Sequence, residues 1–156
     1  MKKFFLALFG FYIGIIVFMP KESLFYKVLE TADKKGINVI SKTYQTPIFL
    51  EIKNAKIFYL KMPSAQIQKI KIYPFLVYNR IDAKNITLKI GDYKIKNLNI
   101  IYIPFLNAKI KGEASFGTFE GYANFKEIKI YIKNPKRDIK GFLRKDNKGY
   151  FYYERF

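Results

Sequence analysis

The sequence KEIKIYIK at residues 126–133 alternates apolar and polar side chains from Glu127 onward. Successive side chains of a β-strand point to opposite faces of a sheet, so this pattern predicts a strand with one apolar face and one wet face. Residues 85–90, with the sequence NITLKI, repeat the pattern. We expect the apolar residues of the two strands to line an apolar groove: Ile86, Leu88, Ile90, Ile128, Ile130 and Ile132.

The same period of two runs through most of the chain after Ile37. Turn signals separate many of the segments, and shifts in parity between Ile67 and Ile70 and between Ile95 and Leu98 predict β-bulges. We expect seven to ten short antiparallel strands, which makes the fold mainly β, as an open curved trough or a sandwich. Further strands are predicted at 37–44, 48–53, 56–61, 65–73, 93–103, 108–111, 119–125 and 149–155, and turns at Lys53-Asn54, Met62-Pro63-Ser64, Gly91-Asp92 and Asn134-Pro135.

Two short sequences occur twice in this region. Pro74-Phe75-Leu76 returns as Pro104-Phe105-Leu106, and Asn54-Ala55-Lys56-Ile57 returns as Asn107-Ala108-Lys109-Ile110. In so biased a composition most such matches arise by chance. If they are meaningful, they mark repeated strand–corner–strand units in which proline interrupts the ladder at an edge.

The N-terminus carries an uninterrupted apolar run of 16 residues from Phe4 to Met19, preceded by Lys2 and Lys3. As a helix it covers about 24 Å, and flanking lysines that snorkel make up the difference from the ~30 Å hydrocarbon core. A cleavable signal peptide would end in small residues, whereas this run ends in Val17-Phe18-Met19-Pro20. The sequence therefore favours an uncleaved transmembrane signal anchor formed by Phe4, Phe5, Leu6, Leu8, Phe9, Phe11, Ile13, Ile15, Ile16, Val17 and Phe18.

Residues 21–35 show the only sustained helical spacing in the rest of the chain. Leu24, Phe25, Val28, Leu29 and Ala32 fall on one helix face, and Gly36 suits the end of the helix. We expect a short amphipathic helix that packs on the following domain, with adsorption to the bilayer as the alternative. The predicted organisation is an anchor at 1–19, a juxtamembrane helix at 20–36 and a β-rich domain at 37–156.

The composition excludes several kinds of chemistry. The 156 residues contain no Cys, His or Trp, which rules out disulfides, thiolate zinc sites and histidine-based triads. The net charge is +17, and lysine supplies most of it. Lysines on the wet faces of strands explain such a charge through solubility and edge protection, without any ligand. Attraction to anionic lipid or nucleic acid is the alternative.

No catalytic, cofactor or metal site stands out. The glycines of GEASFGTFEG at 112–121 match no phosphate-binding loop and predict bends or bulges instead. Glu113 and Glu120 could approach each other across a hairpin, but one pair does not define a glycosidase-like dyad. We therefore expect no enzyme activity, no cofactor and no small-molecule substrate.

The order of these features resembles a known family. A short anchor runs into MPKESLFYKVLE, then PIFLEIKNAKIFYL and IKIYPFLVYNRI; KEIKIYIK follows Gly117 and Gly121, and GYFYYERF closes the chain. This pattern looks like a short form of the type II secretion system protein N family and broadly resembles the β-rich domains of AsmA-like envelope proteins. The resemblance implies a single-pass protein of the bacterial inner membrane with its C-terminal domain in the periplasm. It also implies secretion-machinery or envelope proteins as partners, and for the AsmA-like proteins lipid handling on an apolar curved sheet.

Three hypotheses follow. The first is a non-enzymatic, membrane-anchored accessory protein of type II secretion or envelope assembly. The second is a lipid-binding or lipid-transfer protein whose lysines attract acidic head groups. The third is a nucleic-acid-binding β-domain, against which the membrane anchor argues.

Overall fold

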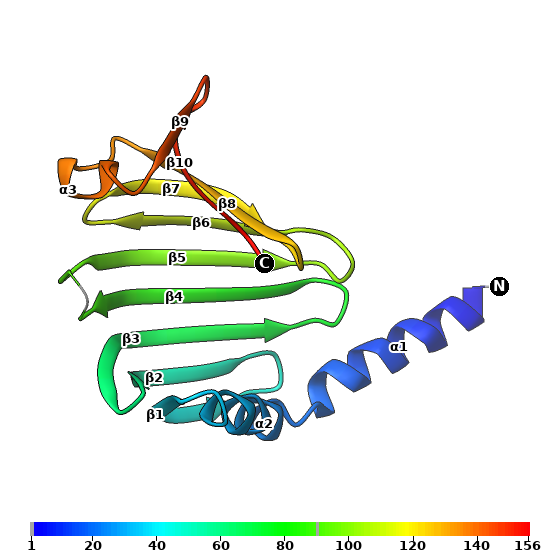
Figure 1. Ribbon diagram of the computed structural model, residues 1–156. Helices are drawn as coiled ribbons and strands as arrows, with labels where there is room; N and C mark the ends of the chain where they lie inside the picture. The colour runs from blue at the N-terminus through cyan, green and yellow to red at the C-terminus, as the bar shows by residue number, and fades with distance from the viewer. Residues whose placement is uncertain (1, 90) are drawn as a thin grey trace.

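A computed structural model describes residues 2–89 and 91–156. Two helices lead into one antiparallel sheet of ten strands, in the order β1-β2-β3-β4-β5-β6-β7-β8-β10-β9 (Figure 1). The elements are α1 (Lys2–Phe18), α2 (Lys21–Asp33), β1 (Ile37–Gln45), β2 (Leu50–Tyr59), β3 (Met62–Pro74), β4 (Asn79–Leu88), β5 (Lys94–Tyr102), β6 (Ala108–Ala114), β7 (Gly117–Ala123), β8 (Glu127–Lys133), α3 (Arg137–Lys140), β9 (Arg144–Asp146) and β10 (Gly149–Arg155).

The sheet is a meander, because each of the first seven strands pairs with the next one along the chain. Only the end departs from this order: β10 pairs with β8, and the short β9 forms the outer edge. Figure 1 shows that the described residues form one open layer that twists from β1 to β10, and all their strands belong to this single sheet. The mainly-β prediction is confirmed, and of its two forms the open sheet is the one observed.

Alternation gives the sheet two different faces. Ile52 on β2 lies opposite Ile70 on β3, which lies opposite Ala83 on β4. The residues between them, such as Lys53, Lys69 and Lys84, therefore point to the other side. We call the two sides the apolar face and the polar face.

A row of irregular positions crosses four neighbouring strands. The regular pairing skips Asn54, Gln68, Asn85 and Lys96, which follow one another across β2, β3, β4 and β5. Asn54 and Asn85 have left-handed backbones, with φ of 51° and 53°, a conformation that asparagine tolerates better than most residues. The Asn85 side-chain amide also donates a hydrogen bond to the Gln68 side chain. We call these four residues the bulge row.

The bulge row explains why apolar residues in these strands are three apart instead of two. Ile67 and Ile70 share the apolar face, as do Ile95 and Leu98, so both predicted parity slips are confirmed. The turn predicted at Lys53-Asn54 is wrong, because β2 runs through it. Asparagine is common in turns, but its left-handed conformation at position 54 serves a bulge.

Other boundaries differ from the sequence prediction in smaller ways. Met62, Pro63 and Ser64 begin β3, and the turn lies just before them at Leu60 and Lys61, both with positive φ. Gly91-Asp92 and Asn134-Pro135 do lie between elements, as predicted. The sequence pattern does not predict α3 or β9, which are only four and three residues long.

Helix α2 covers one end of the apolar face. Phe25 packs against the most buried cluster of the sheet, and Glu22 binds Thr43 and Gln45 of β1 through its carboxylate and its backbone N–H. The amphipathic helix therefore packs on the sheet, as its spacing predicted. Leu24 and Val28 are nevertheless exposed, since the helix presents a narrower stripe to the sheet than the sequence pattern suggested.

The best-packed core lies beneath α2, in the first half of the sheet. Leu50 and Ile52 are 1% exposed and are the largest fully buried side chains. Ala55, Ile67, Ala83 and Ile86 complete this cluster. In β6–β10, only Ile110 and Phe119 are buried to a similar degree, so the second half of the sheet has much less cover.

Candidate functional site

The apolar face continues across the sheet well beyond the part that α2 covers. Cross-strand pairing aligns its residues in rows that run from β2 to β10, and along these rows the described side chains carry no charge. One row contains Leu50, Ile72, Ile81, Ile100, Ile110, Gly121, Ile130 and Tyr152, and the next contains Ile52, Ile70, Ala83, Leu98, Gly112, Phe119, Ile132 and Tyr150.

The face deepens into an apolar hollow at its far end. This hollow has a volume of about 360 Å³, within the range of small-molecule sites. The short helix α3 and the residues after it form one wall, and β5, β7, β8 and β10 form the floor. Its lining contains no charged residue: Tyr93, Ile95, Phe116, Phe119, Ile130, Ile132, Ile139, Phe142, Leu143 and Tyr152.

Five of the six predicted groove residues lie on this one face, in two separate places. Ile86 and Leu88 lie on β4, where Ile86 is buried in the core cluster and Leu88 packs against it. Ile128, Ile130 and Ile132 lie on β8 and are half-buried, with the last two in the hollow. Ile90 lies outside the described residues. Strands β5, β6 and β7 separate the two groups, so they belong to one broad face and do not face each other.

Two glycines keep the floor of this face open. The ring of Phe119 lies over Gly112, where a Cβ would come within 2.4 Å of it. At Gly121 a Cβ would meet the backbone oxygen of Lys129 at 2.1 Å. The bends or bulges predicted for GEASFGTFEG are not found at these two positions, because Gly112 and Gly121 lie inside β6 and β7, which pair with each other without a register shift. Glycine is needed at position 121 because β7 and β8 approach too closely there for any side chain.

The predicted anchor residues form α1, and most of them are exposed. Exposure is 69% for Phe4, 61% for Phe9 and 86% for Phe18, while only Ile16 is buried, at 8%. The end of α1 is tied to the sheet, since the Lys21 ammonium donates to the carbonyl oxygens of Ile16 (2.7 Å) and Pro47 (2.8 Å). Burial lowers the pKa of Lys21.

Helix α1 is 17 residues long, which is at the short end for a membrane-spanning helix. Within residues 2–89 and 91–156, no single helix is both long enough and apolar enough to cross a bilayer. Only α1 and α2 taken together pass that test, and they are bent by 59° relative to each other.

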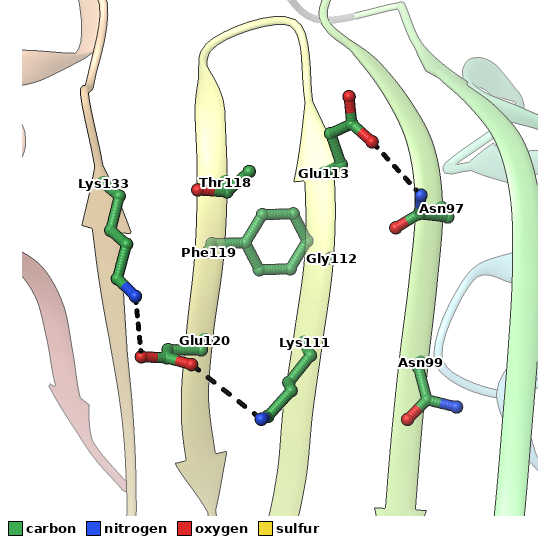
Figure 2. A pocket seen from close by; sticks show the side chains of 9 residues that line it. All are labelled: Asn97, Asn99, Lys111, Gly112, Glu113, Thr118, Phe119, Glu120 and Lys133. Carbon is green, nitrogen blue, oxygen red and sulfur yellow. Dashed lines mark hydrogen bonds and ion pairs between the residues drawn. The ribbon is translucent and has the colours of Figure 1, made fainter.

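The polar face gathers charge into small clusters with an acid at the centre. Figure 2 shows one of them, in which the Glu120 carboxylate lies between Lys111 (3.9 Å) and Lys133 (3.4 Å). Glu113 instead contacts Lys96 and the side-chain amide of Asn97. The two glutamates therefore have separate partners, and their arrangement gives no shared carboxylate pair.

The tightest of these clusters surrounds Glu51. Its carboxylate contacts Lys53 at 3.1 Å, Lys69 at 3.2 Å and Lys71 at 3.8 Å. The hydrogen bond from Lys53 lowers the pKa of Glu51, and Lys69 adds to this effect against the opposing influence of burial. A similar balance lowers the pKa of Asp146: burial raises it, but hydrogen bonds from the Lys148 N–H, Tyr131 and Lys129 outweigh burial.

These lowered values predict an acid-sensitive sheet. A carboxylate whose pKa is lower in the folded state stabilises that state above its unfolded pKa, and the gain is lost as pH falls through the folded value. We therefore expect the free energy of unfolding to decrease as the pH falls below about 4, the ordinary range of carboxyl pKa values. Glu51→Gln should reduce this acid dependence in urea unfolding at several pH values. Glu30→Gln, which removes an exposed pair with Lys34, should leave it unchanged; an equal effect of both would contradict the prediction.

The part of the chain that the structure describes holds no group of three or more acidic side chains that could bind a metal. Comparisons with protein-family models, curated proteins and solved structures find no match. The resemblance to the protein N and AsmA-like families therefore stays a prediction.

Sequence reasoning missed several residues of the apolar face. Phe119, Phe116 and Tyr152 line the hollow, but their segments contain too many glycines or aromatic residues for alternation to mark one face. Lys21 carries a charge directly after the predicted anchor, yet it is 3% exposed and joins the end of α1 to the β1–β2 connection. Only the position of Lys21 at the end of an apolar run hinted at that role.

Proposed function

We propose that this protein is a membrane-anchored, non-enzymatic lipid-binding protein that holds acyl chains on the apolar face of its sheet. The observation that carries the proposal is the continuous apolar face, which runs from β2 to β10 and is covered by α2 only at its first strands. Large exposed apolar surfaces on folded proteins mark interaction sites, because leaving them in water is costly.

The chemistry of this face fits an extended apolar chain. Its rows consist mainly of isoleucine, with small residues at Gly112 and Gly121 and aromatic rings at Phe119 and Tyr152. The hydroxyls of Tyr93 and Tyr152 are the only polar side-chain groups among the residues that line the hollow, and the Tyr152 hydroxyl already donates to Glu154, so little is left there to orient a compact polar ligand. Acyl chains need apolar contact without specific hydrogen bonds, and the uncharged rows supply it.

Helix α1 favours lipid over a soluble apolar ligand. Its exposed side chains, including Phe4, Phe9 and Phe11, form a surface that a bilayer would cover, and Lys2 and Lys3 would lie among head groups. The proposal places α1 in the bacterial inner membrane and the sheet in the periplasm. Lipid would then be available where the sheet begins.

Site-specific photo-crosslinking tests this function in the full-length membrane-bound protein. The photoreactive amino acid p-benzoylphenylalanine would replace Ile130 on the apolar face and, in a matched variant, its neighbour Tyr131 on the polar face. A second matched pair is Leu98 and Asn97. After irradiation in cells grown with radiolabelled fatty acid, we expect lipid adducts at Ile130 and Leu98 and none at Tyr131 and Asn97.

Other adducts would point to other functions. If position 130 crosslinks to protein and not to lipid, the apolar face binds a protein partner and not acyl chains. Equal labelling of both members of a pair would mean that lipid contacts the two faces of the sheet alike, as bulk lipid would. Either result overturns the proposal.

A role beside type II secretion or envelope-assembly machinery stays a prediction, because no described contact selects a partner protein. Nucleic acid is less well supported by the geometry. The basic side chains of the polar face surround acids such as Glu51, Glu120 and Asp146, which interrupts the positive stripe that a phosphate backbone would follow.

A further inference from the structure

Four of the connections between strands lie together at one end of the sheet. In a meander every second turn falls at the same end, so the β1–β2, β3–β4, β5–β6 and β7–β8 connections share it. The C-terminus joins them, since the Phe156 N–H donates to the carbonyl of Lys126 at 2.9 Å. Figure 1 shows α1 projecting past this same end.

These connections are apolar and exposed. Phe105 is 98% exposed, Phe125 is 86% exposed and Val77 is 64% exposed. Ile48, 53% exposed, and Phe156, 76% exposed, lie at the same end of the sheet, toward its two edges. We call these five residues the turn rim.

Charge separates the two ends of the sheet. In the connections 46–49, 75–78, 103–107 and 124–126, Lys126 is the only charged residue. At the opposite end, Lys61, Lys89 and Asp92 lie in or beside the turns, and Lys136 follows β8. Solvent-exposed turns are ordinarily polar, so the turn rim is the end that departs from expectation.

Direct contacts place the turn rim beside α1. The Tyr12 hydroxyl donates to the carbonyl of Phe75 at 2.6 Å, and Lys21 joins the end of α1 to Pro47 in the β1–β2 connection. Tyr12 lies six residues before Phe18, which corresponds to about 9 Å along the helix. The β3–β4 turn therefore lies level with the second half of α1.

The backbone at the tip of the rim supports a role for its side chains. Phe105 has φ of 66°, in the left-handed region where bulky residues are uncommon and glycine or asparagine would be less strained. Its ring is almost fully exposed, so the ring contributes almost nothing to packing within the sheet. A strained, exposed aromatic residue points to a contact outside the chain.

We infer that the turn rim inserts into the interfacial layer of the same bilayer that holds α1. Apolar and aromatic side chains at an interface bury about 5–10 Å into the boundary between head groups and acyl chains. The turns would not enter the hydrocarbon core, because it offers no hydrogen-bond partners to the polar backbone groups of a turn. Lys126 lies where an ammonium group meets lipid phosphates.

Insertion of the rim would bring one end of the apolar face to the bilayer surface. Acyl chains could then pass between the bilayer and the face without crossing open water. This inference rests on the proposed bilayer location of α1, but not on the binding of lipid along the sheet.

The absence of tryptophan in the natural sequence permits a direct test. Four single variants of the full chain carry one tryptophan each: F105W and F125W in the rim, F9W in α1, and Y59W at the opposite end. Tyr59 is a matched control, because it is an exposed aromatic residue (50%) at the end of β2 and does not line the apolar hollow. Each protein is reconstituted into phosphatidylcholine–phosphatidylglycerol vesicles, with and without dibrominated acyl chains that quench nearby tryptophan.

We expect F105W and F125W to emit at shorter wavelength than Y59W and to lose emission in the brominated vesicles, as F9W does. If F9W is quenched while F105W and F125W behave like Y59W, the rim lies in water and the inference is overturned. If F9W is not quenched, α1 is outside the bilayer and the anchor in the proposed function fails. If all four are quenched alike, the sheet lies flat on the membrane and the rim has no special role.

Discussion

Ile52→Asp should unfold the first half of the sheet. Ile52 is 1% exposed and lies in the core cluster with Leu50 and Ile67 beneath α2. A carboxylate placed there has no cationic partner in the cluster, and an uncompensated buried charge costs about 3–5 kcal/mol. Stabilities of natural domains are about 5–15 kcal/mol, so the substitution would remove a large fraction of the folded state's margin. Urea unfolding of the full chain in detergent micelles, followed by circular dichroism, measures the change.

Two further variants separate burial from charge. Ile52→Val removes one methylene and should cost only about 0.5–1.5 kcal/mol. Lys56→Asp puts the same carboxylate on the polar face of the same strand, where it is exposed, and should change stability little. An Ile52→Asp protein as stable as Lys56→Asp would show that this core contributes little to folding.

Gly121→Val is expected to separate β8 and β10 from the rest of the sheet. A Cβ at this position would lie 2.1 Å from the Lys129 carbonyl oxygen and 2.7 Å from the Ile130 Cα, and both are backbone atoms of β8. Backbone cannot turn aside as a side chain can, so β7 and β8 must move apart. We expect a loss of about 3 kcal/mol, at the upper end of the usual cost of overpacking.

Hydrogen exchange would locate this damage. Amides of β8 and β10 should lose protection in Gly121→Val, while β2, β3 and β4, which carry the core cluster, should keep theirs. Gly141→Ala is the matched control, since nothing lies within 4 Å of its Cβ and its backbone is right-handed. It should be neutral or slightly stabilising. Unchanged protection of β8 in Gly121→Val would contradict the steric argument.

Much of the fold could be predicted because apolar and polar residues alternate along most of the strands. Strict alternation in segments such as KEIKIYIK allows only one face to be apolar, and the three-residue spacing from Ile67 to Ile70 identifies a bulge. Alternation carries no information about layers, however, so an open sheet and a sandwich fitted the sequence equally. The short β9 and α3 were missed because three or four residues are too few for any period to appear.

The candidate site was harder to predict, because it depends on which strands become neighbours. Ile86 and Ile130 were rightly assigned to apolar faces, but their separation by three strands is a property of the meander. The turn rim had a partial signal in the repeated Pro-Phe-Leu sequences, both of which lie at connections on the α1 end. The other repeat did not correspond, since Asn54 lies inside a strand and Asn107 precedes one.

The bulge row also bears on how the chain finds its pairing. Strands of alternating isoleucine and lysine resemble one another, and a slip of two residues would keep every side chain on its proper face. Asn54, Gln68, Asn85 and Lys96 interrupt the alternation at one level in four neighbouring strands. If one strand shifted by two residues, its irregular position would no longer lie beside the irregular position of its neighbour. Between the two positions, its isoleucines would then point to the polar face. The row therefore favours the observed register over one shifted by two residues.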